Sequence, residues 1–135
     1  MQIQKQNVIV IESDPQVLKG LVLLLEDMQF SVISAGHMVD LEIMASTLNE
    51  CPVLLLLPFE TDRQPSGIAQ VTRLRALFEH RVPAILLSHE NDLGPEKYID
   101  DEILVLSERI LPKQLRTTIL RILDNELAVW HTASM

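Results

Sequence analysis

The chain has 135 residues, 47% of them hydrophobic and 22% charged, which fits a single domain over 1–135 with a core from about 7 to 124. Its formal net charge of −8 argues against nucleic-acid binding and against attachment to anionic membranes, because both need clustered Lys and Arg. The lone cysteine and the lack of a long apolar span predict a reduced, cytoplasmic protein.

Strand and helix patterns alternate along the chain. In order, the sequence predicts a strand at 8–11, a helix at 14–28, a strand at 31–35, a helix at 38–49, a strand at 53–57, a helix at 66–79, and strands at 83–88 and 103–106 before a helix from 112 to about 130. Asp14 and Pro15 mark the first helix start, since aspartate caps helices and proline suits their first turn. The acidic segment 89–102 has room for a short helix at most, because Gly94 and Pro95 interrupt it.

This alternation predicts an α/β fold with a doubly wound, five-stranded parallel sheet. All-apolar runs such as 53–57 are typical of strands that helices cover on both faces. Right-handed crossovers then give a flavodoxin-like, three-layer sandwich. In such folds the functional crevice lies at the carboxyl ends of the strands, and here Pro58 stands at the end of the third strand.

Four stretches of the chain resemble the receiver domains of two-component response regulators. They are 8–15, 52–67, 82–88 and 106–116, which match the first strand and its loop, the third strand with the active-site loop, the fourth strand, and the fifth strand with the last helix. The tail is most similar to the C-terminal receivers of hybrid histidine kinases. The resemblance implies a CheY-like fold and a role in phosphorelay signalling.

The resemblance also assigns positions to a phosphorylation site, and most of its reactive groups are missing. Two acids that bind Mg²⁺ in receivers align with Glu12 and Ser13, and the aspartate that takes the phosphoryl group aligns with Pro58. Proline has no side-chain oxygen nucleophile, and Mg²⁺ needs several oxygen ligands, so we expect neither phosphorylation nor a Mg²⁺ cofactor. Glu12 and Asp14 are the remaining weak metal candidates, and Asp14 is better explained as a helix cap.

The remaining receiver positions are also altered, apart from one hydroxyl. Ser88 fits the residue that contacts a phosphoryl oxygen. Glu108 replaces a lysine with an anion, and Val105 replaces an aromatic switch residue. We expect Glu108 to pair with Arg109 or Arg63, as an exposed pair of small energetic value.

Other reactive side chains give weaker signals. An acidic rim at the mouth of the crevice is expected from Glu12, Asp14, Glu60 and Asp62, and a solvated rim explains it better than a cation site. His89 stands where receivers keep a small residue and is expected to crowd the entrance. Cys51 is expected to be buried and inert.

The last helix offers a candidate interaction face. Leu127 and Trp130 are apolar near the chain end, and Val105 lies on the strand that receivers use for output and dimer contacts. Two explanations stay open for the helix end: docking on a partner or second copy, and packing back onto the first helix.

These observations favour a receiver-like domain without catalysis, acting through a protein partner such as a histidine kinase, an adjacent domain or a second copy as a homodimer. One alternative is a receiver fold that responds to a non-phosphoryl ligand or cation in the crevice. A third, an enzyme on a flavodoxin-like sheet, lacks a nucleophile or cofactor loop, and fold alone supplies neither.

Overall fold

A computed structural model describes residues 5–37, 40, 50–60, 66–89, 97–100 and 102–134, with side chains as far as 124. The elements are β1 (Asn7–Ile11), α1 (Pro15–Asp27), β2 (Ser31–Ala35), β3 (Leu54–Pro58), α3 (Gly67–Phe78), β4 (Ala84–Ser88), β5 (Lys97–Asp100), β6 (Ile103–Ser107) and α4 (Pro112–Ser134). The helix predicted at 38–49 falls largely outside the described residues.

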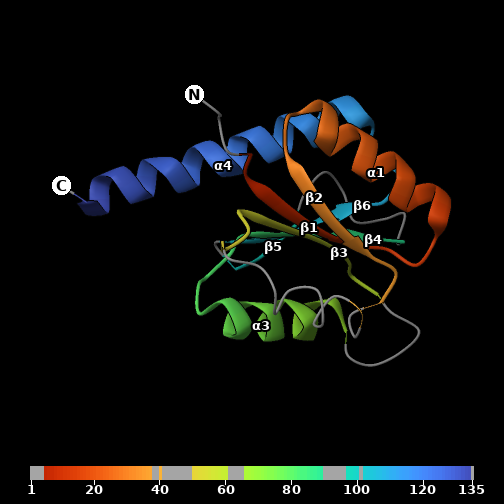
Figure 1. Ribbon diagram of the computed structural model, residues 1–135, viewed down its shortest axis with the longest axis horizontal. Coiled ribbons are helices and arrows are strands. Elements are labelled where there is room, and N and C mark those ends of the chain that lie inside the picture. Colours follow the sequence, from red (N-terminus) through yellow and green to blue (C-terminus); the bar gives the residue numbers. More distant parts are fainter. Residues whose placement is uncertain are drawn as a thin grey trace.

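The strands form one sheet of six, in the order β2-β1-β3-β4-β6-β5. Neighbouring strands are parallel except for β5 and β6, which are antiparallel. Helices α1 and α4 cover one face of this sheet and α3 covers the other (Figure 1). The predicted doubly wound α/β fold is therefore confirmed.

Alternation along the central strands explains the all-apolar runs. Ile9 and Leu55 point into the core beneath α3, whereas Val10 and Leu56 point into the core shared with α1 and α4. Both faces of each central strand are thus shielded from water. A polar side chain on either face would have to be buried, which costs free energy unless the side chain is hydrogen-bonded. This pattern leaves the strand ends as the places where polar side chains can gather.

The strand β5 was not predicted, since the acidic segment before it indicated a short helix at most. It forms an edge of the sheet, and its backbone pairs with β6 over Lys97↔Val105 and Tyr98↔Leu104. The apolar and aromatic residues Tyr98 and Ile99 suit a strand, and the preceding acidic run obscured this short signal. The expected five parallel strands are present, with β5 as an antiparallel addition.

Helix boundaries follow the expected signals. The Asp14 side chain accepts from the backbone N–H of Gln16 at 2.9 Å, which confirms it as the cap of α1. Helix α4 begins at Pro112 as predicted and runs to Ser134, and its last turns project beyond the sheet (Figure 1). No helix in the described part of the chain is long and apolar enough to cross a membrane.

Candidate functional site at the carboxyl edge of the sheet

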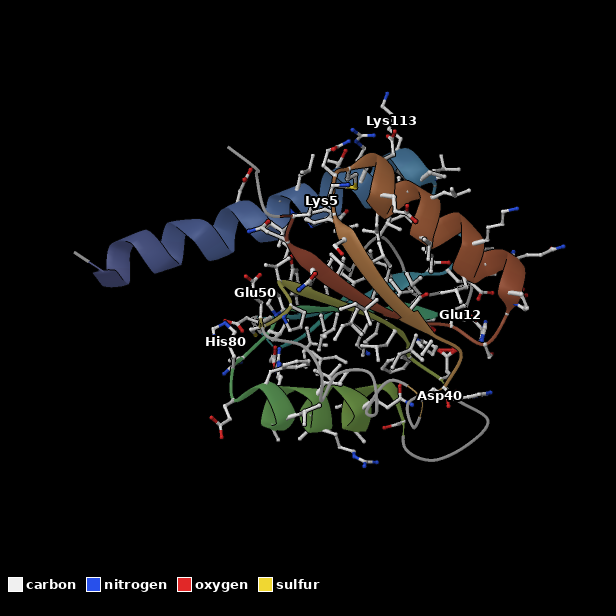
Figure 2. The ribbon with its side chains drawn as sticks, viewed as in Figure 1. Lys5, Glu12, Asp40, Glu50, His80 and Lys113 are labelled. Atoms are coloured by element: carbon white, nitrogen blue, oxygen red, sulfur yellow. The ribbon has the colours of Figure 1, made fainter. Side chains whose placement is uncertain are left out.

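Parallel strands bring four of the predicted positions to one edge of the sheet. Pro58 ends β3 and Ser88 ends β4, and the register places Pro58 beside Leu87. Glu12 follows β1 and Glu108 follows β6. Figure 2 shows Glu12 at this end, while Glu50 and His80, which precede β3 and β4, lie at the opposite end.

Close packing behind Pro58 fixes the start of the next helix. A Cβ atom on Gly67 would lie 2.2 Å from the carbonyl oxygen of Pro58 and 3.0 Å from that of Phe59. Only glycine fits this approach, so α3 begins directly against the end of β3. The backbone N–H of Gly67 also donates to the Phe59 carbonyl at 3.3 Å. The chain between β3 and α3 is therefore held tightly at both of its described ends.

Glu60 makes the central contact of the site. Its Oε1 accepts a hydrogen bond from the Ser88 hydroxyl, and its Oε2 accepts one from the backbone N–H of His89 at 2.8 Å. Ser88 is fully buried. Both carboxylate oxygens are thus bound by donors at the end of β4, which ties the loop after β3 to that strand. The expectation of a solvated rim is wrong for Glu60.

His89 connects the end of β4 to the loop after β6 through Glu108. Its Nδ1 lies 2.6 Å from Oε2 of Glu108, and the Glu108 backbone N–H donates to the Ser88 carbonyl at 2.8 Å. The hydrogen bond to Glu108 raises the pKa of His89, and the negative charges of Glu108, Glu60 and Glu12 raise it further against a lowering by desolvation. The pairing of Glu108 with Arg109 is not seen, and Arg63 lies outside the described residues.

The positions that align with the metal-binding acids of receivers do not converge. Oε1 of Glu12 accepts from the backbone N–H of Asp14 at 3.1 Å, and Asp14 is occupied with capping α1. Ser13 is exposed, and Asp62 lies outside the described residues. Among the described residues, no group of three His, Cys, Asp or Glu side chains is arranged to hold a metal ion.

Comparison with known proteins gives a likeness at the level of structure. No family model and no curated protein matches the sequence. A receiver domain (CheY-like) from Methylobacillus flagellatus superposes with a TM-score of 0.68 at 23% identity, covering 88% of this chain and 99% of that one. The N-terminal domain of a response regulator/sensory box/GGDEF 3-domain protein from Carboxydothermus hydrogenoformans gives 0.72 at 13% identity, over 93% and 100%. The fold is that of a receiver domain.

A further solved structure places the receiver fold inside a longer protein. The anti-anti-sigma factor PhyR from Bartonella quintana matches with a TM-score of 0.74 at 19% identity, covering 98% of this chain and 53% of that one. This chain therefore matches about half of that longer protein.

Within this receiver fold, the predicted interaction face needs correction. Val105 is 1% exposed and packs in the core beneath α3, so it cannot contact a partner and its assignment to that face is wrong. The side chains of Leu127 and Trp130 lie outside the described part of the chain, although the helix backbone continues through them. The prediction for these two residues stays untested.

Cys51 also departs from expectation. It is exposed just before β3, at the end of the sheet opposite to the site, so its prediction as a buried residue is wrong. Burial of part of the side chain raises the pKa of its thiol, which keeps the thiolate fraction low.

Two residues of the site were misjudged from sequence. The sequence predicts a solvated rim position for Glu60 and an obstructing role for His89, whereas together they connect the ends of β3, β4 and β6. The available signal was their position: each lies within two residues of a strand whose carboxyl end meets this edge.

Proposed function

We propose that this chain is a receiver-like signalling domain that works without phosphorylation and acts by binding a protein. The observation that carries the proposal is the set of contacts at the carboxyl edge of the sheet: Pro58 ends β3, and the Ser88 hydroxyl donates to Glu60. In receivers this hydroxyl is expected to contact a phosphoryl oxygen. Here an internal carboxylate holds it.

The chemistry of the site supports this proposal. Phosphoryl transfer to protein needs a nucleophilic oxygen and cations that stabilise the moving group. Pro58 offers no side-chain oxygen, and Glu108 places an anion where receivers keep a lysine. The imidazole of His89, which directly follows Ser88, is already paired with Glu108 at 2.6 Å. An incoming phosphoryl group would meet three carboxylates, those of Glu12, Glu60 and Glu108.

We propose that the domain produces its signalling output by binding a protein partner. Matched solved structures include the N-terminal domain of a three-domain response regulator protein, and an anti-anti-sigma factor of which this chain covers 53%. In this chain Leu111 is 62% exposed and Leu120 is 48% exposed, so the region of α4 presents apolar surface. A kinase, an adjacent domain and a second copy are the three candidates for contact with it.

The test is chemical phosphorylation. The wild-type chain and Pro58→Asp are incubated with Mg²⁺ and acetyl phosphate, and intact mass is recorded. We expect no added phosphate on either protein, because an aspartate alone restores neither the metal acids nor the lysine. A phosphate adduct on the wild type would overturn the proposal. An adduct on Pro58→Asp alone would show that the surrounding residues are less impaired than we infer.

A further inference from the structure

The antiparallel strand β5 leaves one side of the sheet open in the described part of the chain. It pairs with β6 on one side and is the last strand in the order β2-β1-β3-β4-β6-β5. All of its residues are at least partly exposed. Its outer side therefore presents backbone N–H and C=O groups that can pair with a further strand.

A bulge determines which side chains of β5 share a face. The register shifts between Tyr98 and Asp100, so Ile99 is an extra residue that faces no residue of β6. Regular alternation would place Lys97 and Asp100 on opposite faces, whereas the bulge brings both to the face covered by α3. The carboxylate of Asp100 lies 3.7 Å from the guanidinium of Arg75 on α3, in agreement with this placement. Tyr98 lies on the other face.

We propose that the outer side of β5 pairs with β5 of a second copy of this chain, antiparallel and about a two-fold axis at Tyr98. In this arrangement Tyr98 faces Tyr98 of the second copy. On either side of the axis, Lys97 faces Asp100 of the second copy. The inference goes beyond the proposed function and does not rest on it, because the pairing uses only groups of β5.

Charge complementarity supports a second copy as the occupant. Edge strands that avoid pairing often carry a lysine or a bulge. In β5 both features have a counterpart across the axis, since the bulge aligns Lys97 with Asp100 of the second copy. Opposite charges that face each other across antiparallel strands favour that pairing, and like charges oppose it. Exposed ion pairs contribute little energy, so these two pairs determine the register more than the affinity.

Exposed apolar surface on β5 supports the same arrangement. Tyr98 is 52% exposed and Ile99 is also exposed, although the strand has four residues. Across the axis the two tyrosine rings cover each other, and facing aromatic residues stabilise antiparallel strand pairs. An interface of two such short strands is smaller than that of stable dimers, so we expect a Kd on the order of 100 µM or weaker.

Sedimentation equilibrium of the full chain measures the association. At about 0.15 M salt, which screens the repulsion between copies of net charge −8, the average mass should rise from 15.3 kDa toward twice that value between about 10 µM and about 1 mM. Tyr98→Lys places two ammonium groups opposite each other and should weaken the association about tenfold or more. Leu23→Lys makes the same kind of change on an exposed position of α1 and should leave it unchanged.

Disulfide cross-linking tests the register separately. The exposed Cys51 is first replaced by serine. Under oxidised glutathione, Tyr98→Cys should then form a covalent dimer, because directly opposed residues lie about 4.5–5.5 Å apart. Lys97→Cys is the matched control, since the two copies of this position lie diagonally across the axis at about 7–8 Å and should cross-link far more slowly.

Each outcome supports or overturns the pairing. A chain that stays monomeric at every concentration would overturn it, and the open side of β5 would then fit an extended segment of a different protein. Association that Tyr98→Lys leaves intact would place the contact elsewhere and would also overturn it. If Tyr98→Lys does not fold, the cross-linking decides: equal rates for the two cysteine variants would refute the two-fold register. None of these results bears on the phosphorylation test, which probes the other end of β4.

Discussion

His89 and Glu108 join the ends of two neighbouring strands, with Nδ1 of the imidazole 2.6 Å from Oε2 of the carboxylate. The pair lies beside the contact of Glu60 with the end of β4, so charges from the loops after β3, β4 and β6 meet at one point. The imidazole follows β4 and the carboxylate follows β6, so their contact holds these two loops together. The pKa of His89 and the pH dependence of stability should follow from this pair.

The first prediction concerns the titration of His89. Its pKa should lie above the ordinary value of 6.5, chiefly because of the hydrogen bond to Glu108. In Glu108→Gln the pKa should fall back toward the ordinary value, and in the control Glu26→Gln it should not move. An NMR titration of the imidazole signals measures this. A wild-type pKa at or below the ordinary value would contradict the pairing.

The same shift has a consequence for stability. Because the folded state holds the proton more tightly than the unfolded chain, the pair's contribution is full below about pH 6.5 and is lost as pH rises through the higher folded pKa. The His89 side chain is 63% exposed, so solvent limits the effect to about 1 kcal/mol at most. Urea unfolding of wild type and Glu108→Gln should show a difference that shrinks from pH 6 to pH 9. A difference that grows with pH would refute this linkage.

The second prediction concerns the hydroxyl of Ser88. Replacing Ser88 by alanine leaves one oxygen of the half-buried Glu60 without a donor, which should cost about 1.5–3 kcal/mol of unfolding free energy. The control is Thr72→Ala, since that hydroxyl is exposed on α3 and bonds only to a carbonyl of its own helix at 3.1 Å. The control should be neutral or slightly stabilising. Equal effects of the two changes would show that the Glu60 contact contributes little.

The third prediction compares two glycines. Gly67→Ala should destabilise by about 1–3 kcal/mol, because the new Cβ would lie 2.2 Å from the Pro58 carbonyl oxygen. Gly20→Ala should stabilise by about 1 kcal/mol, since nothing lies within 4 Å of its Cβ position inside α1. Thermal unfolding of both variants gives the comparison. A tolerated alanine at Gly67 would mean that α3 can move away from β3.

The fourth prediction concerns the arginines that hold the edge strand. Nε of Arg75 donates to the Val82 carbonyl at 2.9 Å, and its guanidinium lies 3.7 Å from Asp100 at the end of β5. Its side chain is 17% exposed, whereas that of Arg81, which contacts the same acid at 3.5 Å, is 57% exposed. Arg75→Ala should cost about 1.5–3 kcal/mol and Arg81→Ala less than about 1 kcal/mol.

Hydrogen exchange should report the same contrast locally. The amides of β5 should exchange faster in Arg75→Ala than in Arg81→Ala, because the edge strand loses its better-buried anchor. Identical exchange in the two variants would show that pairing with β6 alone holds β5 in place.

The sequence was sufficient for the layout of the sheet and for the positions at its functional edge. All-apolar runs and helix starts such as Asp14–Pro15 are strong local signals, and parallel topology then determines where strand ends meet. Four residues placed at the edge in this way, Glu12, Pro58, Ser88 and Glu108, do lie there.

Which side chains contact each other within the site could not be predicted from the sequence. The contacts of Glu60 and His89 depend on which way two loop side chains turn, and the neighbouring Arg109 is an equally plausible partner for Glu108 by sequence. The strand β5 was missed because its four residues follow an acidic run, and its place at the sheet edge depends on distant residues, notably Arg75.

The central claim is that the crevice does not take up a phosphoryl group. The most direct measurement adds beryllofluoride and Mg²⁺, which form a phosphoryl-like group on a receptive aspartate, to the uniformly ¹⁵N-labelled wild-type chain. We predict no change in the amide signals of Glu12, Ser88, His89 and Glu108, which surround Pro58. Saturable shifts confined to these residues would contradict the account.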